Sequence, residues 1–234
     1  MDIRLHYLEK GSGEEVLLLL HGNGGDCTYF RHQMAYFSQQ YRVIALDTRG
    51  HGASPRGGKP FTIVQFAEDL HDFLIETGIA QANILGFSDG GNIALTFALK
   101  YPDFVKKLIL NGANLDPSGL KAWFYVPVLV GYRFASLFAA HSRRAKYDTE
   151  LWGLMVNEPQ ITPDQLAALT MPVLVIAGTH DIIPRKHTLL MHKSIPGSVL
   201  ELIRGGHSIA AKAPEAFNSA VMRFLQHGGH PSVG

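Results

Sequence analysis

The sequence predicts an α/β protein with a mostly parallel, doubly wound sheet, because short apolar runs alternate with segments of helical periodicity. The runs at residues 16–20 and 42–46 are apolar on both faces, which is typical of parallel strands covered by helices on each side. Similar runs lie at 82–85, 108–110 and 173–177. The chain of 234 residues is long enough to bury a substantial core.

Helical periodicity is clearest at residues 62–77. Apolar side chains recur there at the spacing of one helix face, and polar residues such as Asp69 lie between them. Gly78 follows and predicts the end of this helix. A second helix is expected from the pattern GNIALTFALKYP, which follows the run at 82–85 after a short glycine-rich turn.

The alternation fails once, between about Leu115 and Gln160, where no buried strand is recognisable. Short helical patterns predict a helical cap insertion at 115–160 over one end of the sheet, with an α/β core formed by residues 1–114 and 161–234. The insertion carries a basic patch and aromatic side chains that either line an apolar pocket or pack as ordinary helix residues. The basic residues are Arg143, Arg144 and Lys146, and the aromatic residues are Trp123, Phe124, Tyr125, Tyr132 and Phe134.

Charge and composition exclude several classes of function. The 21 Lys and Arg residues nearly balance the 20 Asp and Glu residues, and no block of like charges predicts a nucleic-acid partner. The single cysteine, Cys27, cannot form an internal disulfide and is expected to be a small buried residue. No secretory signal or membrane span is recognised, so a cytoplasmic location is expected. The H-x-x-H pair His227 and His230 lies in a glycine-rich tail and is expected to be solvated, not metal-binding.

Ser88 is the central candidate, because residues 86–90 (GFSDG) match the G-x-S-x-G pattern of a nucleophile elbow. In this motif a sharp strand-to-helix turn strains the serine backbone and projects the hydroxyl into a cleft. The strand and the helix nearly touch, so Gly86 and Gly90 are expected where no side chain would fit. The predicted strand before Ser88 and the predicted helix after it supply the context that the motif requires.

A serine hydroxyl needs a base to remove its proton and an acid to orient that base. Asp181 follows the apolar run at 173–177, and His207 follows the next strand-like segment, VLELI. The chain order Ser, Asp, His is the one expected for this architecture. Two alternatives remain: Asp181 as a helix cap before IIPRKH, and Asp116 as the acid in its place.

The oxyanion that forms during acyl transfer needs two N–H donors. One is the backbone N–H of Asp89, the residue after the serine, and the glycine-rich segment HGNGG at 21–25 offers the N–H of Asn23 as the second. His21 in this segment is expected to anchor the loop. The carboxylate of Asp89 either meets a cationic group of a substrate or serves as an acid in the first turn of a helix.

The order of these motifs makes the chain resemble the α/β-hydrolase superfamily, specifically its esterase-like members with a helical cap. In that family the turn DTRGHGAS is mostly structural, which implies that Asp47, Arg49 and His51 hydrogen-bond within the loop. The five motifs are HGNGG at 21–25, DTRGHGAS at 47–54, GFSDGG at 86–91, GTHD at 178–181 and GGHS at 205–208.

The resemblance implies Ser88 as nucleophile, His207 as base and Asp181 as acid, with Asn23 and Asp89 as oxyanion donors. The expected function is a carboxylesterase-like serine hydrolase that cleaves small or medium carboxylic esters through an acyl-enzyme and needs no cofactor or metal. Its expected partner is a small-molecule ester. A lactone, an amide or a carbon–carbon bond is an alternative target of the same residues, and a ligand receptor on a hydrolase scaffold is the non-enzymatic alternative.

Overall fold

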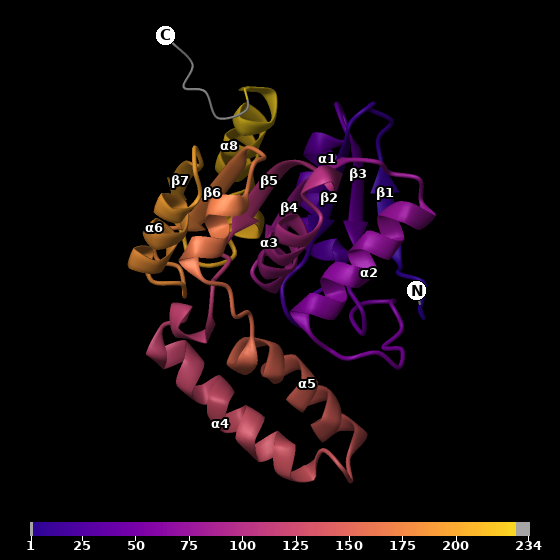
Figure 1. The fold of residues 1–234 in the computed structure, drawn as a ribbon, viewed down its shortest axis with the longest axis vertical. Coiled ribbons are helices and arrows are strands. Elements are labelled where there is room, and N and C mark those ends of the chain that lie inside the picture. The colour runs from indigo at the N-terminus through magenta and orange to yellow at the C-terminus, as the bar shows by residue number, and fades with distance from the viewer. Residues whose placement is uncertain (1, 228–234) are drawn as a thin grey trace.

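Seven strands form one sheet in the order β1-β3-β2-β4-β5-β6-β7, in a computed structural model that describes residues 2–227 (Figure 1). Only β1 is antiparallel to its neighbour, so the predicted, mostly parallel α/β sheet is confirmed. Residue 1 and residues 228–234, with His230 of the H-x-x-H pair, lie outside the described part. The strands are β1 Tyr7–Lys10, β2 Val16–Leu20, β3 Arg42–Leu46, β4 Ala82–Phe87, β5 Val105–Asn111, β6 Val173–Gly178 and β7 Val199–Ile203.

Helices cover both faces of the sheet, because the central strands present apolar side chains in both directions. In β2, Leu18 and Leu20 pack into the core on one face, while Leu17 and Leu19 pack into the core on the other. Helices α2, α3 and α6 contribute to the first core, and α1, α7 and α8 contribute to the second. The bounds are α1 Arg31–Phe37, α2 Ile63–Glu76, α3 Asp89–Lys100, α6 Arg185–Ser194, α7 Ile209–Lys212 and α8 Pro214–His227.

The predicted strands and the helix at 62–77 are present with small changes at their ends. Thr62 lies just before α2 and caps it, since its side chain accepts a hydrogen bond from the Gln65 N–H at 3.1 Å. The apolar pattern does not predict β1, because its residues YLEK are mostly polar and exposed at the edge of the sheet. Short 3₁₀ turns lie at Cys27–Phe30, Pro102–Phe104, Pro117–Gly119 and Pro163–Ala168.

The segment between β5 and β6 contains two helices, α4 (Ala122–Phe138) and α5 (Arg143–Asn157), which lie below the sheet in Figure 1. The two helices pack side by side. A Cβ atom at Gly131 of α4 would lie 2.7 Å from the ring of Trp152 in α5, so the glycine permits this close packing. No helix in the described part of the chain is long and apolar enough to cross a membrane.

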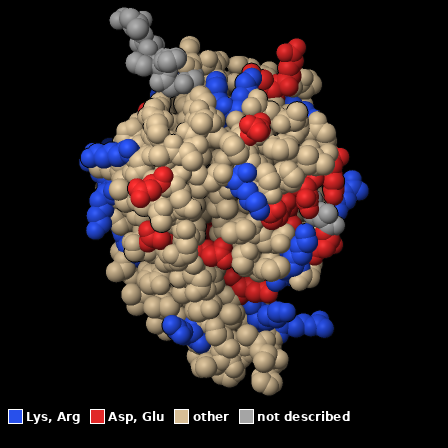
Figure 2. Space-filling model, viewed as in Figure 1, with Lys and Arg blue, Asp and Glu red and all other residues tan. Residues whose placement is uncertain are grey.

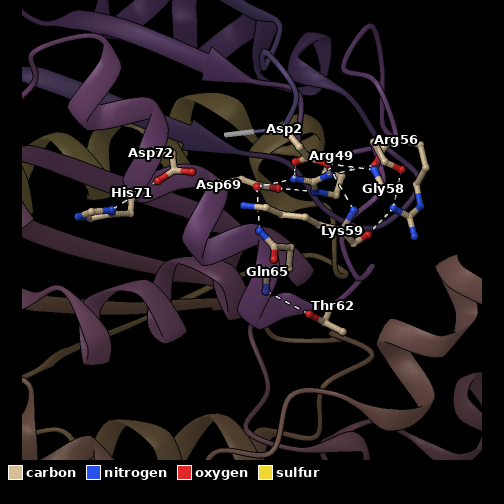
Figure 3. A network of polar contacts seen from close by, with 11 residues as sticks. Asp2, Arg49, Arg56, Gly58, Lys59, Thr62, Gln65, Asp69, His71 and Asp72 are labelled. Atoms are coloured by element: carbon tan, nitrogen blue, oxygen red, sulfur yellow. Dashed lines mark hydrogen bonds and ion pairs between the residues drawn. The ribbon is translucent and has the colours of Figure 1, made fainter.

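A buried ion-pair network joins the turn at 47–54 to α2 and to the N-terminal segment (Figure 3). Arg49 is fully buried and donates to both carboxylate oxygens of Asp69 at 2.6 Å, and to Asp2 at 2.6 and 3.1 Å. Burial alone would lower the pKa of Arg49, but its bonds to Asp69 and Asp2 raise it. The expectation that Arg49 bonds within its own loop holds only for its bond to the Arg56 carbonyl at 3.1 Å, since its ionic partners lie outside the loop. Asp69 is buried because it neutralises Arg49.

We expect Asp69→Asn to lower the free energy of unfolding by about 3 kcal/mol, because the buried Arg49 keeps only the partly exposed Asp2 as a counter-charge. Urea denaturation followed by circular dichroism measures the change. Asp103→Asn is the matched control at an exposed position and should change stability by less than about 0.5 kcal/mol. Equal stability of the two variants would contradict the importance assigned to this ion pair.

Candidate active site

Ser88 lies at a strained turn between β4 and α3, with φ of 55° and ψ of −122°. In the described part of the chain, it is the only residue other than glycine with positive φ. A Cβ atom at Gly86 would lie 2.1 Å from the carbonyl oxygen of Gly90, and one at Gly90 would lie 2.1 Å from that of Leu20. The close approach of strand and helix therefore requires both glycines, as the motif predicts.

The structure brings Ser88, His207 and Asp181 together, although 119 positions separate Ser88 from His207. Nε2 of His207 lies 2.9 Å from Oγ of Ser88, and Nδ1 of His207 lies 2.6 Å from Oδ1 of Asp181. Because an ionised carboxylate only accepts hydrogen bonds, Nδ1–H donates to Asp181 and Nε2 is left to accept the proton of Ser88. Asp181 is buried, and the Ile183 N–H donates to its Oδ1 at 3.0 Å, which holds the carboxylate in place.

The geometry also tests the two alternatives for the acid. Asp181 does not cap a helix, since α6 begins at Arg185 and Pro184 occupies its N-cap position. The carboxylate of Asp116 accepts a backbone N–H at 2.8 Å in a 3₁₀ turn, and within the described residues it makes no hydrogen bond with His207. Asp181 is therefore the carboxylate that orients the His207 ring.

The glycine-rich loop after β2 (residues 21–25, the glycine loop) lies directly against Ser88. A Cβ atom at Gly22 would lie 3.0 Å from the Cβ atom of Ser88, so a larger residue would crowd the serine. Asn23 of this loop lines the same cavity as Ser88. Asp89 is the first residue of α3, where a backbone N–H has no acceptor within the helix. Both residues predicted as oxyanion donors thus lie beside the serine, near the positive end of the α3 dipole.

A cavity of about 630 Å³ lies next to Ser88, between the sheet and the helices α4 and α5. The side formed by the sheet loops is polar and includes Asn23, Asp89 and His207. This combination of an apolar wall and a few polar groups is typical of a site for a small, largely apolar molecule. The apolar wall is formed mainly by Trp123, Phe124, Leu151, Trp152 and Met155.

The aromatic candidates of the sequence line this cavity only in part. Trp123 and Phe124 line it, whereas Tyr125, Tyr132 and Phe134 do not. The aromatic pattern does not point to the three apolar residues of α5 in the wall. Their i, i+1, i+4 spacing places them on one helix face. The spacing alone does not predict that this face lines a cavity, because that depends on which part of the protein the face meets.

His6, Cys27 and Asp47 form a cluster whose potential metal-ligand atoms lie within 4.8 Å of one another. Both oxygens of Asp47 are already engaged, by Nδ1 of His6 at 2.7 Å and by the Cys27 and Ala53 N–H groups at 2.7 and 2.8 Å. Burial raises the pKa of Cys27 to about 12, which disfavours a metal-binding thiolate. The cluster therefore holds the turn at 47–54 in place, and Cys27 is buried as predicted.

Comparison with known proteins agrees with this geometry. The family model described as the alpha/beta hydrolase fold matches residues 15–147. The chain belongs to this family. Serine hydrolase BPHL of Homo sapiens is 30% identical over an alignment of 247 positions, which covers 96% of this chain and 84% of that protein. The fold expected from the sequence motifs is thus shown by family membership as well as by the sheet.

Two further proteins are similar to the chain, one in sequence and one in fold. A putative carbamate hydrolase, RutD of Caulobacter sp. (strain K31), is 29% identical over an alignment of 245 positions, which covers 92% of this chain and 91% of that protein. The enol-lactonase from Burkholderia xenovorans LB400 has a TM-score of 0.80 at 23% identity, and the match covers 96% of this chain and 97% of that one. The likeness to the lactonase is one of fold.

In this α/β hydrolase the side chain of Asn23 connects three parts of the molecule. Its Nδ2 donates to Oδ2 of Asp89 and to the Leu151 carbonyl of α5, both at 2.8 Å. Burial raises the pKa of Asp89, and the bonds from Asn23 and Asn92 oppose this shift. The Asp89 carboxylate is thus engaged inside the protein, which favours the first-turn interpretation over contact with a cationic substrate group.

His21 and His51 of the α/β hydrolase are buried and hold loops together. Nδ1 of His21 donates to the Gly22 carbonyl at 2.8 Å, and its Nε2 accepts from the Thr48 N–H at 3.1 Å. Nδ1 of His51 donates to the Arg49 carbonyl at 3.0 Å. Burial lowers the pKa of both rings, that of His51 to about 4 with a smaller contribution from His21. Both rings are therefore neutral, and His21 anchors the glycine loop as expected.

We predict that the free energy of unfolding falls as the pH is lowered from about 6.5 to about 4, with up to about 3 kcal/mol of the loss due to His51. In the unfolded chain His51 binds a proton near pH 6.5, but in the folded chain only near pH 4, so acid favours unfolding. His51→Gln keeps a donor but has no titrating ring, and should flatten the pH dependence measured by urea denaturation.

His141→Gln, at an exposed position, is the matched control for this measurement and should leave the pH dependence as it is in the wild type. If His51→Gln has the same pH dependence as the wild type, the assignment of the acid-sensitive step to His51 is wrong.

Proposed function

We propose that this α/β hydrolase is a serine hydrolase that cleaves small or medium carboxylic esters through an acyl-enzyme. The observation that carries the proposal is the continuous chain of contacts from Asp181 through His207 to Ser88, with N···O distances of 2.6 and 2.9 Å, beside a cavity of about 630 Å³. The relative of 30% identity named as a serine hydrolase supports the nucleophile. The apolar wall supports a substrate with a short apolar acyl or alkyl group.

In the proposed acylation, Oγ of Ser88 attacks the ester carbonyl carbon while its proton passes to Nε2 of His207. The backbone N–H groups of Asn23 and Asp89 hold the negative oxygen of the tetrahedral intermediate. The C–O bond to the leaving group then breaks, and His207 returns the proton to the departing alkoxide. Asp181 keeps the imidazole in its tautomer and stabilises the imidazolium, without itself taking the proton.

Deacylation repeats the same steps with water. His207 removes a proton from water as the oxygen attacks the acyl carbon, and the proton then passes to Ser88 as the acid leaves. This route needs no cofactor or metal ion. A cytoplasmic location is part of the proposal and fits the free, buried Cys27.

The helical insertion at 115–160 is proposed to act as a cap on the core formed by 1–114 and 161–234. Three contacts connect its second helix, α5, and the residue after it to the core. Glu150 forms a two-bond ion pair with Arg56 at 2.8 and 2.9 Å. The Leu151 carbonyl bonds to Asn23, and the Ile63 N–H donates to Glu158 at 2.6 Å.

Carbamate or lactone hydrolysis is the second candidate, favoured by the 29% identity to a protein named as a putative carbamate hydrolase. The same attack by Ser88 applies to each of these carbonyl groups. A lactone is a cyclic ester whose departing alkoxide stays attached to the acyl group, and a carbamate carries nitrogen on the carbonyl carbon. A panel of p-nitrophenyl esters, lactones and carbamates compared by kcat/KM distinguishes them.

Ser88→Ala is expected to lower kcat/KM for p-nitrophenyl acetate by roughly 10⁴-fold or more, because no other group supplies the nucleophile. A fluorophosphonate probe should label the wild type and not this variant. Ser208→Ala is the matched control, since this serine lines the same cavity and should keep both labelling and turnover. Labelling that survives Ser88→Ala would refute the assignment of the nucleophile.

Met155→Ala is expected to shift the preference among p-nitrophenyl esters toward longer acyl chains, because it removes a side chain from the apolar wall of the cavity. If the enlarged cavity accepts one more methylene of the acyl chain, kcat/KM for the longer ester relative to the shorter one should rise by roughly 10-fold. Val156→Ala, on the same helix but away from the cavity, is the control. The wall has no role in substrate selection if both variants keep the wild-type order of acyl chain lengths.

A further inference from the structure

The outer face of α4 carries large apolar side chains that nothing in the described chain covers. Their positions repeat at intervals of three or four residues, so they form one stripe along the helix. Most soluble proteins do not leave such a contiguous stripe open to water without a binding role for it. The stripe consists of Trp123 (67% exposed), Val126 (51%), Val130 (62%), Phe134 (65%), Leu137 (73%) and Phe138 (48%).

The packing of α4 on α5 does not explain this stripe. The opposite face of α4 meets α5 through Gly131, against which the Trp152 ring lies, and through the buried Ala135. Inner and outer faces are thus distinct, and the outer face makes no contribution to the fold that would require its large apolar residues.

The segment that includes α4 is also strongly cationic. Residues 117–147 contain five Lys and Arg residues and no Asp or Glu, a formal charge of +5 in a chain whose total is +1. Arg144 pairs with Asp148 at 2.9 Å, but Arg133, Arg143 and Lys146 form no ion pair with any described residue. In Figure 2 the lowest tip of the molecule is tan, with blue side chains on both sides of it and red side chains above them.

We infer that the outer face of α4, together with Arg133, Arg143 and Lys146, binds the surface of an anionic phospholipid bilayer. An apolar helix face flanked by cations can lie in the plane of such a surface, with its apolar side chains among the upper acyl carbons and its cations near the headgroups. The apolar side chains of the stripe gain binding free energy when they are buried in the lipid, and the unpaired cations attract anionic headgroups specifically.

A second copy of the chain fits this face less well. Two molecules that met through their α4 stripes would bring two segments of charge +5 together without an acidic group from either segment between them. An anionic lipid surface covers the same apolar side chains and neutralises the charge. Charge complementarity therefore favours lipid over self-association.

The stripe begins beside the cavity. Trp123 belongs to both, since it is 67% exposed on α4 and also lines the cavity next to Ser88. Docking through α4 would bring this side of the cavity to the lipid surface. If the proposed ester hydrolysis is correct, substrates dissolved in the lipid would be concentrated at that opening, but lipid binding itself does not depend on the catalytic assignment.

The test is co-sedimentation of the full chain with vesicles made of phosphatidylglycerol and phosphatidylcholine in equal parts, compared with vesicles of phosphatidylcholine alone. We expect binding to the anionic vesicles that weakens as salt is raised, and much weaker binding to the neutral ones. The Ser88→Ala protein should bind equally well, so failure of the hydrolase proposal would leave this result unchanged.

Two double variants separate the apolar and ionic contributions. Phe134→Ser with Leu137→Ser should weaken binding to anionic vesicles at least roughly 10-fold. Arg143→Gln with Lys146→Gln should weaken it roughly 30-fold, as expected for two cations near the surface. Matched controls replace exposed residues of the same kind elsewhere: Val64→Ser with Ile75→Ser on α2, and Lys10→Gln with Arg204→Gln.

Binding that is weakened by the apolar double variant of α4 and by the ionic double variant of α5, and is kept in both controls, supports the inference. Thermal melting shows whether all variants fold. The inference is overturned if the wild type does not bind anionic vesicles, or if the controls weaken binding as much as the variants of α4 and α5. It is also overturned if light scattering shows a dimer of the wild type that Phe134→Ser with Leu137→Ser converts to monomer, because the stripe would then be a self-association surface.

Discussion

The close approach of β4 and α3 around Ser88 is the constraint on which the candidate site depends. The carbonyl oxygen of Gly90 occupies the space where a Cβ atom of Gly86 would lie, so the chain can turn there only through glycines and a strained serine. This turn points the start of α3 at the cavity and places Asp89 beneath the glycine loop. The carboxylate of Asp89 then holds Asn23, so one backbone contact fixes both the nucleophile and the loop next to it.

The polar groups around this turn divide sharply between those that are free to react and those that are not. His21, His51 and Asp47 are all close to the site, but their polar atoms bond mainly to backbone groups of neighbouring loops. Ser88 and His207 bond to each other and face the cavity. Of these five side chains, Ser88 and His207 line the cavity, where a substrate could replace the contact between them, whereas His21, His51 and Asp47 do not line it.

Local signals made much of this arrangement predictable from the sequence. The central strands are predicted by short apolar runs. The triad candidates are predicted by short motifs in the chain order that this chemistry needs, namely Ser88, Asp181 and His207. The pairing of Asp69 with Arg49 could not be predicted, because helical periodicity records polarity and not a partner 20 residues away. The part of the cavity wall that α5 forms could not be predicted either, since tertiary packing decides which surface a helix face meets.

The two helices of the insertion have different relations to the core, and this difference affects how the cavity can open. The polar contacts with the core come from α5 and the residue that follows it, through Glu150, the Leu151 carbonyl and Glu158. The helix α4 joins the core near its start, where the Lys121 N–H donates to the Ile182 carbonyl at 2.9 Å, and its outer face is open to solvent. A surface that binds α4 would therefore act on the part of the cavity wall that has fewer polar contacts with the core. The wall from α5 would keep its bond to the glycine loop, so access could change at Trp123 while the groups around Ser88 stay in place.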